Sequence, residues 1–226
     1  MKTPIHISLF LFVVCQCCFA QTDSNLIGAG DWSAVVRDSQ GGPFLRGRLL
    51  VYDDQGISTH NHARIYLELQ HVCAEKIWYP PIEIYCFGTN LDLQFEDAHG
   101  QPIPSYPSVI VALSCGPCWV TLPMDATVRV RVDDGPLGPH TKPDGFDIQN
   151  RMGDWIIPPN STNDYFLAAS FTPSTNNPSP LHYATWHGTL KLPKVKIHGP
   201  GLLRSLAATN ELHLRDEQNG DHSSPH

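Results

Sequence analysis

The sequence predicts an all-β protein folded as an antiparallel β-sandwich. Residues 127–132 alternate between valine on one side and threonine or arginine on the other, the pattern of a strand with one buried and one wet face. Residues 63–72 and 91–96 show the same alternation. The 20 prolines and 17 glycines disfavour long helices and supply turns. Since each strand has a wet face, antiparallel sheets are favoured over a parallel sheet covered by helices.

Other apolar segments complete the predicted sheets. They are residues 32–37, 44–52, 82–87, 108–114, 119–122, 164–171 and 183–192. Turn-forming residues separate them at the spacing of an all-β domain. Residues 133–159 are rich in Gly, Pro and Asp and are predicted to form a long ordered loop. The pattern fits an immunoglobulin-like or a jelly-roll-like sandwich and leaves the strand order open.

The first 20 residues are expected to be a secretory signal peptide. Lys2 gives a basic start, residues 5–14 form an apolar core, and residues 18–20 place small residues around a cleavage site. This core is shorter than the roughly 20 apolar residues of a membrane anchor. Lipid attachment at Cys15 or Cys17 is the alternative, and it is disfavoured because neither cysteine follows a small residue. We therefore expect a secreted or otherwise extracytoplasmic protein, in a periplasm or at a cell surface.

Three segments are predicted along the chain: the signal peptide at 1–20, a β-sandwich domain at 21–198 and a C-terminal tail at 199–226. The Gly-Pro-Gly sequence at 199–201 is expected to end the domain. A short helix is predicted after it, followed by a polar end with the composition of a disordered segment.

The acidic character of the chain limits its partners. The formal net charge is −7, and it becomes −8 when Lys2 leaves with the signal peptide. Nucleic acids and anionic lipids are bound mainly by neutralising phosphates with Lys and Arg, so neither is an expected partner. Lys191, Lys194 and Lys196 are expected to be a solvated strand face. The predicted partner is an extracellular protein or a glycan, and no membrane span is expected after the signal peptide.

Four cysteines remain after cleavage, namely Cys73, Cys86, Cys115 and Cys118. An even number of cysteines in an exported protein predicts disulfides. Of the three possible pairings, the local one is preferred, with Cys73 bonded to Cys86 and Cys115 to Cys118, because each bond closes a short loop. A zinc site would need two closely spaced pairs, and Cys73 and Cys86 are far apart in sequence. We expect no metal and no cofactor.

The segment Cys115-Gly116-Pro117-Cys118 matches the thioredoxin active-site tetrapeptide, a resemblance of four residues. In that chemistry a helix N-terminus lowers the pKa of the attacking thiol. Here residues 119–122 are β-formers and a proline follows them, so a disulfide across a turn is favoured over redox activity.

The remaining polar groups are expected to be solvated. His60 and His62 would share a face of an extended strand but lack a third metal ligand, and the aspartates of residues 133–147 do not follow the spacing of a calcium loop. Three glutamates are expected on the wet faces of strands: Glu68, Glu83 and Glu96. Asn160 begins an Asn-Ser-Thr glycosylation sequon, whose use depends on the host.

The function expected from these observations is a secreted, non-catalytic module for binding or structural interaction. The chain has neither a G-x-S-x-G nor an H-E-x-x-H motif. A carbohydrate-binding or carbohydrate-active sandwich is the first alternative, and an exported thiol–disulfide protein is the second. Three tryptophans within apolar segments are expected in the core: Trp32, Trp119 and Trp186. Trp78, Tyr79 and Trp155 flank proline-rich loops and are the candidate exposed ligand contacts.

Overall fold

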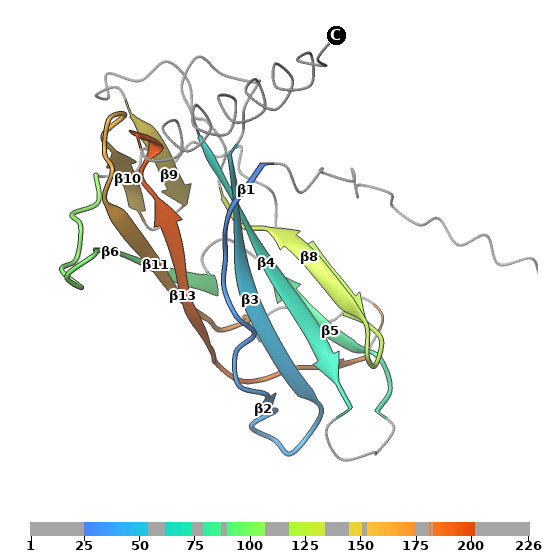
Figure 1. The fold of residues 1–226 in the computed structure, drawn as a ribbon. Coiled ribbons are helices and arrows are strands. Elements are labelled where there is room, and N and C mark those ends of the chain that lie inside the picture. Colours follow the sequence, from blue (N-terminus) through green and yellow to red (C-terminus); the bar gives the residue numbers. More distant parts are fainter. Residues whose placement is uncertain are drawn as a thin grey trace, which may run out of the picture.

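The fold of the chain is all-β, with antiparallel sheets, as the sequence predicts (Figure 1). The computed structural model describes residues 25–53, 62–73, 79–86, 90–106, 118–133, 145–150, 153–174, 181 and 183–201. The predicted signal peptide, the predicted strand at 108–114 and the predicted tail from residue 202 lie outside these ranges. Within them, no helix is long and apolar enough to cross a membrane.

The largest sheet is built on the long hairpin of β3 (Phe44–Asp53) and β4 (Ala63–Val72), whose ten residues pair in continuous register. β8 (Thr127–Arg131) pairs with the other side of β4. β1 (Leu26–Ala29) and β2 (Val36–Arg37) pair with successive stretches of the free edge of β3. The order across the sheet is therefore β1-β3-β4-β8, with β2 beside β3.

A second sheet has the order β13-β11-β6. Its centre is β11 (Asp164–Phe171), in which every second residue is buried. β13 (Leu190–His198) and β6 (Leu91–Asp97) flank it, both antiparallel. β13 carries an irregularity where its register with β11 shifts, and this keeps its apolar residues inward on both sides of Pro193.

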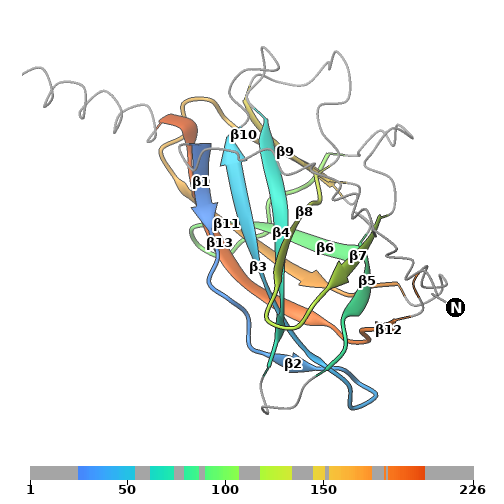
Figure 2. The ribbon, with the colours of Figure 1, turned by 90° about the vertical axis from the view of Figure 1, so that its right-hand side faces the viewer.

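Two smaller sheets complete the described structure. The hairpin of β9 (Phe146–Asn150) and β10 (Gly153–Ile157) lies at one end of the molecule, and β2 lies at the other (Figure 2). β5 (Ile82–Cys86) pairs antiparallel with β7 (Cys118–Leu122). β12 (Ala184–Thr185) adds a short parallel pairing to β5, an exception to the antiparallel rule.

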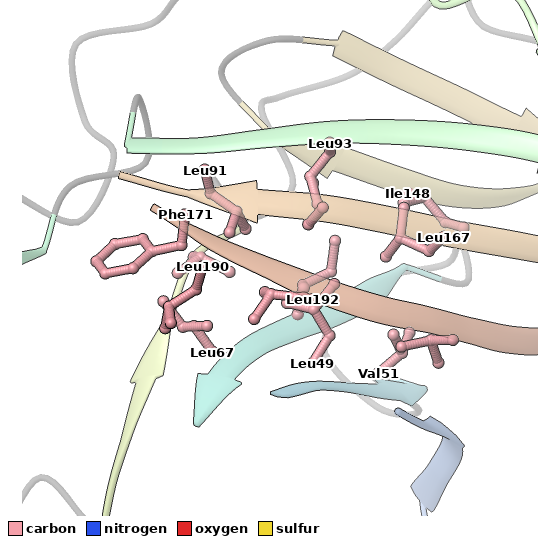
Figure 3. Packing of buried hydrophobic residues seen from close by; sticks show 14 of the residues in the cluster. Leu49, Val51, Leu67, Leu91, Leu93, Ile148, Leu167, Phe171, Leu190 and Leu192 are labelled. Carbon is pink, nitrogen blue, oxygen red and sulfur yellow. The ribbon is translucent and has the colours of Figure 1, made fainter. Parts of the chain in front are cut away.

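One apolar core is shared by all these sheets. Leu49 and Leu67 of the first sheet face Leu167, Leu190 and Leu192 of the second (Figure 3). Full burial of a side chain of this size contributes about 1.5–3 kcal/mol relative to exposure, so this shared core is the main stabilising feature of the fold.

Most predicted strands within the described residues agree with the observed ones, with four differences. Of the predicted strand at 32–37, only β2 at its end forms a strand, and β1 lies where no strand was predicted. Residues 146–157, predicted as part of a long loop, form the β9–β10 hairpin, because Phe146, Ile148, Trp155 and Ile157 supply an apolar face to the core. The predicted strand at 183–192 is interrupted between β12 and β13, where the backbone of His187 bonds instead to residues 38 and 39.

Candidate functional site

The outer surface of the first sheet carries a row of arginines. The register of β3, β4 and β8 places Arg48, Glu68 and Arg129 side by side in one row across three strands. Alternate residues on each strand face the same way. We call this surface the arginine face and define it by nine residues: Trp32, Arg46, Arg48, Tyr66, Glu68, Gln70, Thr127, Arg129 and Arg131.

Trp32 organises one edge of the arginine face. The guanidinium carbons of Arg46 and Arg48 lie 4.8 and 4.7 Å from the centre of its ring, a distance at which a cation is attracted to the π-electrons. The segment is tied to β3 at the next residue, where Ser33 N donates to Gly47 O and Gly47 N donates to Ser33 Oγ. Trp32 is half-buried on this outer surface, so its predicted place in the core is wrong.

Gly47 separates the two arginines of β3 for a packing reason. Its inner side faces β13, where an added Cβ would lie only 3.2 Å from both Leu190 and Leu192. A side chain at this position would therefore require the packed leucine side chains to shift by a few tenths of an ångström. Arg46 and Arg48 point outward. In the Arg-Gly-Arg sequence, the glycine therefore allows close packing of the two sheets, and the arginines supply positive charge to the outer surface.

A single carboxylate serves two arginines at the centre of the face. Arg48 Nε lies 2.5 Å from Glu68 Oε2, and Arg129 Nη2 lies 3.2 Å from Glu68 Oε1. Arg129 also donates from Nη1 to the Tyr52 hydroxyl at 2.9 Å. The side chain of Glu68 is 9% exposed, whereas those of Arg48 and Arg129 are 31% and 38% exposed. The surface offered to solvent is therefore the cationic one.

The charge on this face is unbalanced. Arg46 donates to the neutral side-chain oxygen of Gln70. Among the described outer residues of β3, β4 and β8, Glu68 is the one carboxylate, opposite Arg46, Arg48 and Arg129. The excess is positive although the whole chain has a formal net charge of −7. A positive patch on a negative protein is a local feature with its own attraction for anions.

Arg131 connects the face to a buried network of charges. Its Nε and Nη2 both donate to the Asp133 carboxylate, at 2.9 and 2.6 Å to Oδ2. Asp133 also accepts from Ile65 N at 3.0 Å, which ties the end of β8 to β4. His62 is 2% exposed and lies between Asp133 and Asp147, with nitrogen–oxygen distances of 3.7 and 3.9 Å. The network joins β4, β8 and β9.

The protonation of this network follows from its geometry. Burial alone would lower the pKa of His62, but Asp133 and Asp147 outweigh it and raise that pKa to about 9. Burial would raise the pKa of Asp133, and the proximity of His62 and Arg131 lowers it below its usual value. At neutral pH His62 is therefore protonated and Asp133 is ionised. The predictions that His62 and Asp133 are solvated are wrong.

The outer surface of the second sheet is of another kind. Lys194 pairs with Glu96, and Lys196 pairs with Asp164 at 2.7 Å. His198 adds a contact of 2.7 Å to the same aspartate. The hydrogen bond from Lys196, followed by the contact with His198, lowers the pKa of Asp164. We call this surface the lysine face and define it by Asp92, Gln94, Glu96, Asp164, Phe166, Ala168, Ser170, Lys191, Lys194, Lys196 and His198.

The predicted ligand contacts do not meet in one place. Trp155 is 5% exposed and packs in the core against Phe95, with Nε1 donating to Ile103 O, so its predicted exposure is wrong. Tyr79 is half-buried against the rings of Phe44 and His71. Trp78 lies outside the described residues.

Other predicted residues are distributed through the fold. Trp186 is fully buried, as expected. Trp119 is half-buried against Tyr85 and is not part of the core, so its predicted place there is wrong. Glu68 and Glu83 are buried, which contradicts their predicted exposure. Cys118 begins strand β7, so the helix that thioredoxin chemistry requires does not start there. Asn160 is exposed in the turn after β10.

The sequence did not lead to a prediction of the arginine face, although it contains a pattern that indicates one. Arg46-Gly47-Arg48 and Arg129-Val130-Arg131 are two Arg-x-Arg segments in predicted strands, so each places two arginines on one face. The sequence does not give the strand order, in which both strands flank β4 in the same sheet.

Comparison with known proteins supplies no relative: no protein-family model, curated protein or solved structure matches the chain. Within the part of the chain that the structure describes, no three His, Cys, Asp or Glu side chains gather as metal ligands.

Proposed function

We propose that this chain is a secreted, non-catalytic protein-binding module, whose partner docks on the arginine face through acidic side chains. The observation that carries the proposal is the grouping of Trp32, Tyr66 and the arginines on one outer surface. Protein interfaces are enriched in aromatic residues and arginine, and their energetic hot spots are enriched in Trp, Tyr and Arg.

The lysine face supports the choice of surface by contrast. Its described outer residues are mostly Lys, Asp, Glu, Ala and Ser, the types that interfaces contain less often than the rest of a protein surface. Both faces are outer surfaces of sheets in the same molecule. Their difference is therefore one of composition and pairing, and it favours the arginine face as the docking surface.

Arginine chemistry indicates an acidic partner. A guanidinium is planar and presents a fork of donors that matches a carboxylate in a bidentate way. Arg48 and Arg129 are held by Glu68, and Arg46 is held by Gln70 and the Trp32 ring. Side chains already held in place lose less conformational entropy when a partner binds.

The alternatives receive less support from the described residues. Glycoside hydrolysis uses two carboxyl groups on either side of the scissile bond, and Glu68 lies between two arginines. An exported thiol–disulfide enzyme would need a helix at its cysteine pair, where β7 begins with Cys118. Glycan binding keeps a specific basis in Trp32, and the experiment below separates it from protein binding.

The test compares two double variants that each remove two positive charges. The mature chain is immobilised, and poly-L-glutamate, dextran sulfate and uncharged dextran are passed over it. We expect poly-L-glutamate to bind, and R46A/R48A to weaken it by roughly tenfold or more, since both arginines contact the same ring. K194A/K196A on the lysine face changes net charge equally and is expected to leave this affinity within about twofold.

Two results would overturn the proposal. Equal weakening by both double variants would mean that net charge, and not the arginine face, determines binding. Binding of dextran sulfate in preference to poly-L-glutamate at equal charge, lost in R46A/R48A, would make the ligand an acidic glycan. Uncharged dextran controls for contacts to the sugar backbone itself.

A further inference from the structure

The pairing of β5 with β7 places two cysteines directly opposite each other. Cys86, the last residue of β5, lies directly opposite Cys118, the first residue of β7. Directly opposite residues of an antiparallel pair have Cα atoms about 4.5 or 5.5 Å apart. Disulfides are formed across Cα separations of about 4.4–6.8 Å. The backbone positions of Cys86 and Cys118 therefore fall within the range of a disulfide.

The register of this ladder is fixed by its other pairs. Ile82 lies opposite Leu122, and both are buried in the core. Tyr85 lies opposite Trp119, and their rings meet edge to face at 5.2 Å. A slip by one residue would turn the apolar side chains of β5 away from the core. Burial of these side chains therefore fixes the register that places Cys86 opposite Cys118.

Cys73 lies near the other end of the same ladder. Its backbone nitrogen donates to Asp125 Oδ1 at 3.1 Å, in the turn that follows β7. Two residues earlier, the His71 ring contacts Leu122 O at 3.2 Å. Leu122 lies opposite Ile82, and Cys86 is four residues further along β5. At the rise of a β-strand, four residues span about 13 Å. Cysteines with Cα atoms more than about 7 Å apart cannot be bridged without backbone movement, which disfavours a Cys73–Cys86 bond.

We propose that oxidation joins Cys86 to Cys118 across the β5–β7 ladder, in place of the two local bonds preferred from sequence. The two thiols lose two protons and two electrons, and one S–S bond forms. The electron acceptor is a disulfide, such as glutathione disulfide or a protein disulfide, which is reduced to two thiols. The bond would keep Cys118 from acting with Cys115 as a thioredoxin-like dithiol. It is independent of the arginine face.

The experiment maps disulfides in the full chain recovered from an oxidising secretory compartment. Thiols that remain reduced are blocked with N-ethylmaleimide, and the protein is digested without reductant. The expected result is a cross-linked peptide containing Cys86 and Cys118, which separates into two peptides on reduction. It should persist in C73S and C115S, which act as matched controls, and be lost in both C86S and C118S.

Several results would overturn this proposal. A peptide joining Cys115 to Cys118, or Cys73 to Cys86, in the unmodified chain would restore the local pairing. Recovery of Cys86 and Cys118 with maleimide on both would show that the ladder holds two thiols. Because the unmodified chain is mapped directly, the outcome does not depend on the folding of any variant.

Discussion

The arginine face and the lysine face are outer surfaces of sheets that share one core, yet they use their charges differently. On the lysine face, Lys194 and Lys196 each meet a different carboxylate, Glu96 and Asp164. On the arginine face, two guanidiniums share the single carboxylate of Glu68, and Arg46 bonds to a neutral amide. Each of these two lysines has a carboxylate of its own. The described residues of the arginine face keep a positive excess.

This difference shows that charge content alone does not identify a binding surface. The lysines of β13 are visible as a cluster in the sequence because they lie close together in one segment. In the structure they belong to a solvated surface with ion pairs. The arginines are dispersed over two strands and become a group only when those strands flank β4. The two faces differ in how many of their positive charges are paired with a carboxylate.

The largest expected effect concerns the buried network behind the arginine face. The folded pKa of His62, about 9, exceeds its ordinary value of 6.5, so its stabilisation is complete below pH 6.5 and is lost as pH rises towards 9. This shift corresponds to about 3 kcal/mol of unfolding free energy. Urea unfolding across pH 6–9.5 is expected to show that loss, and H62Q to be less stable by a similar amount at pH 6 with a flatter profile.

The control for this prediction is His198, which contacts Asp164 on the lysine face and is part-exposed. H198Q is the matched histidine-to-glutamine variant, and its unfolding is measured over the same pH range. A profile that is equally steep in H62Q would show that another group is responsible.

A smaller effect is expected from Glu68. E68Q leaves Arg48 and Arg129 without their carboxylate and should lower the free energy of unfolding by about 2 kcal/mol, because hydrogen bonds between charged groups are worth more than neutral ones. E96Q removes the corresponding carboxylate of the lysine face, whose partner Lys194 is 53% exposed, and should cost less than about 1 kcal/mol. Chemical denaturation measures both free energies, and equal costs would show that the two faces do not differ in how strongly their carboxylates stabilise the fold.

Trp32 is expected to act mainly on binding. W32A removes the ring on which Arg46 and Arg48 stack, and each such contact is worth about 0.5–1 kcal/mol at exposed sites. Affinity for poly-L-glutamate should fall by roughly fivefold, as measured by titration calorimetry. F166A, which removes a half-buried ring from the lysine face, is the matched control and should leave the affinity unchanged.

The smallest effect is expected on the lysine face itself. K194A should leave the midpoint of urea unfolding within experimental error, because exposed ion pairs rarely contribute measurably to stability. A clear drop in the midpoint would show that this pair holds β13 to β6, and that the lysine face is more than a solvated surface.

The sequence was sufficient to predict much of the fold, because burial alternates with the period of a strand. The predicted strands at 63–72 and 164–171 have the observed bounds. The β9–β10 hairpin was missed because the Gly, Pro and Asp residues around it masked a short apolar alternation. Strand order depends on contacts between segments distant in sequence, which no local pattern reports.

The candidate site was less predictable, for a related reason. His62 and Asp133 look like loop residues in the sequence, and they are buried because each supplies the opposite charge that the other needs. Trp155 adjoins a proline-rich segment but fills the core, because the hairpin that carries it packs inward. A pairing between charges 71 residues apart in sequence is visible only after folding.

The position of β13 in the second sheet has a consequence for synthesis. β13 pairs with β11 and supplies Leu190, Leu192, Val195 and Ile197 to the core, yet it is the final described strand. A nascent chain must therefore reach residue 198 before its two main sheets can enclose a common interior. Long-range pairing of this kind forms slowly. Until then, the apolar faces of both sheets stay open to solvent.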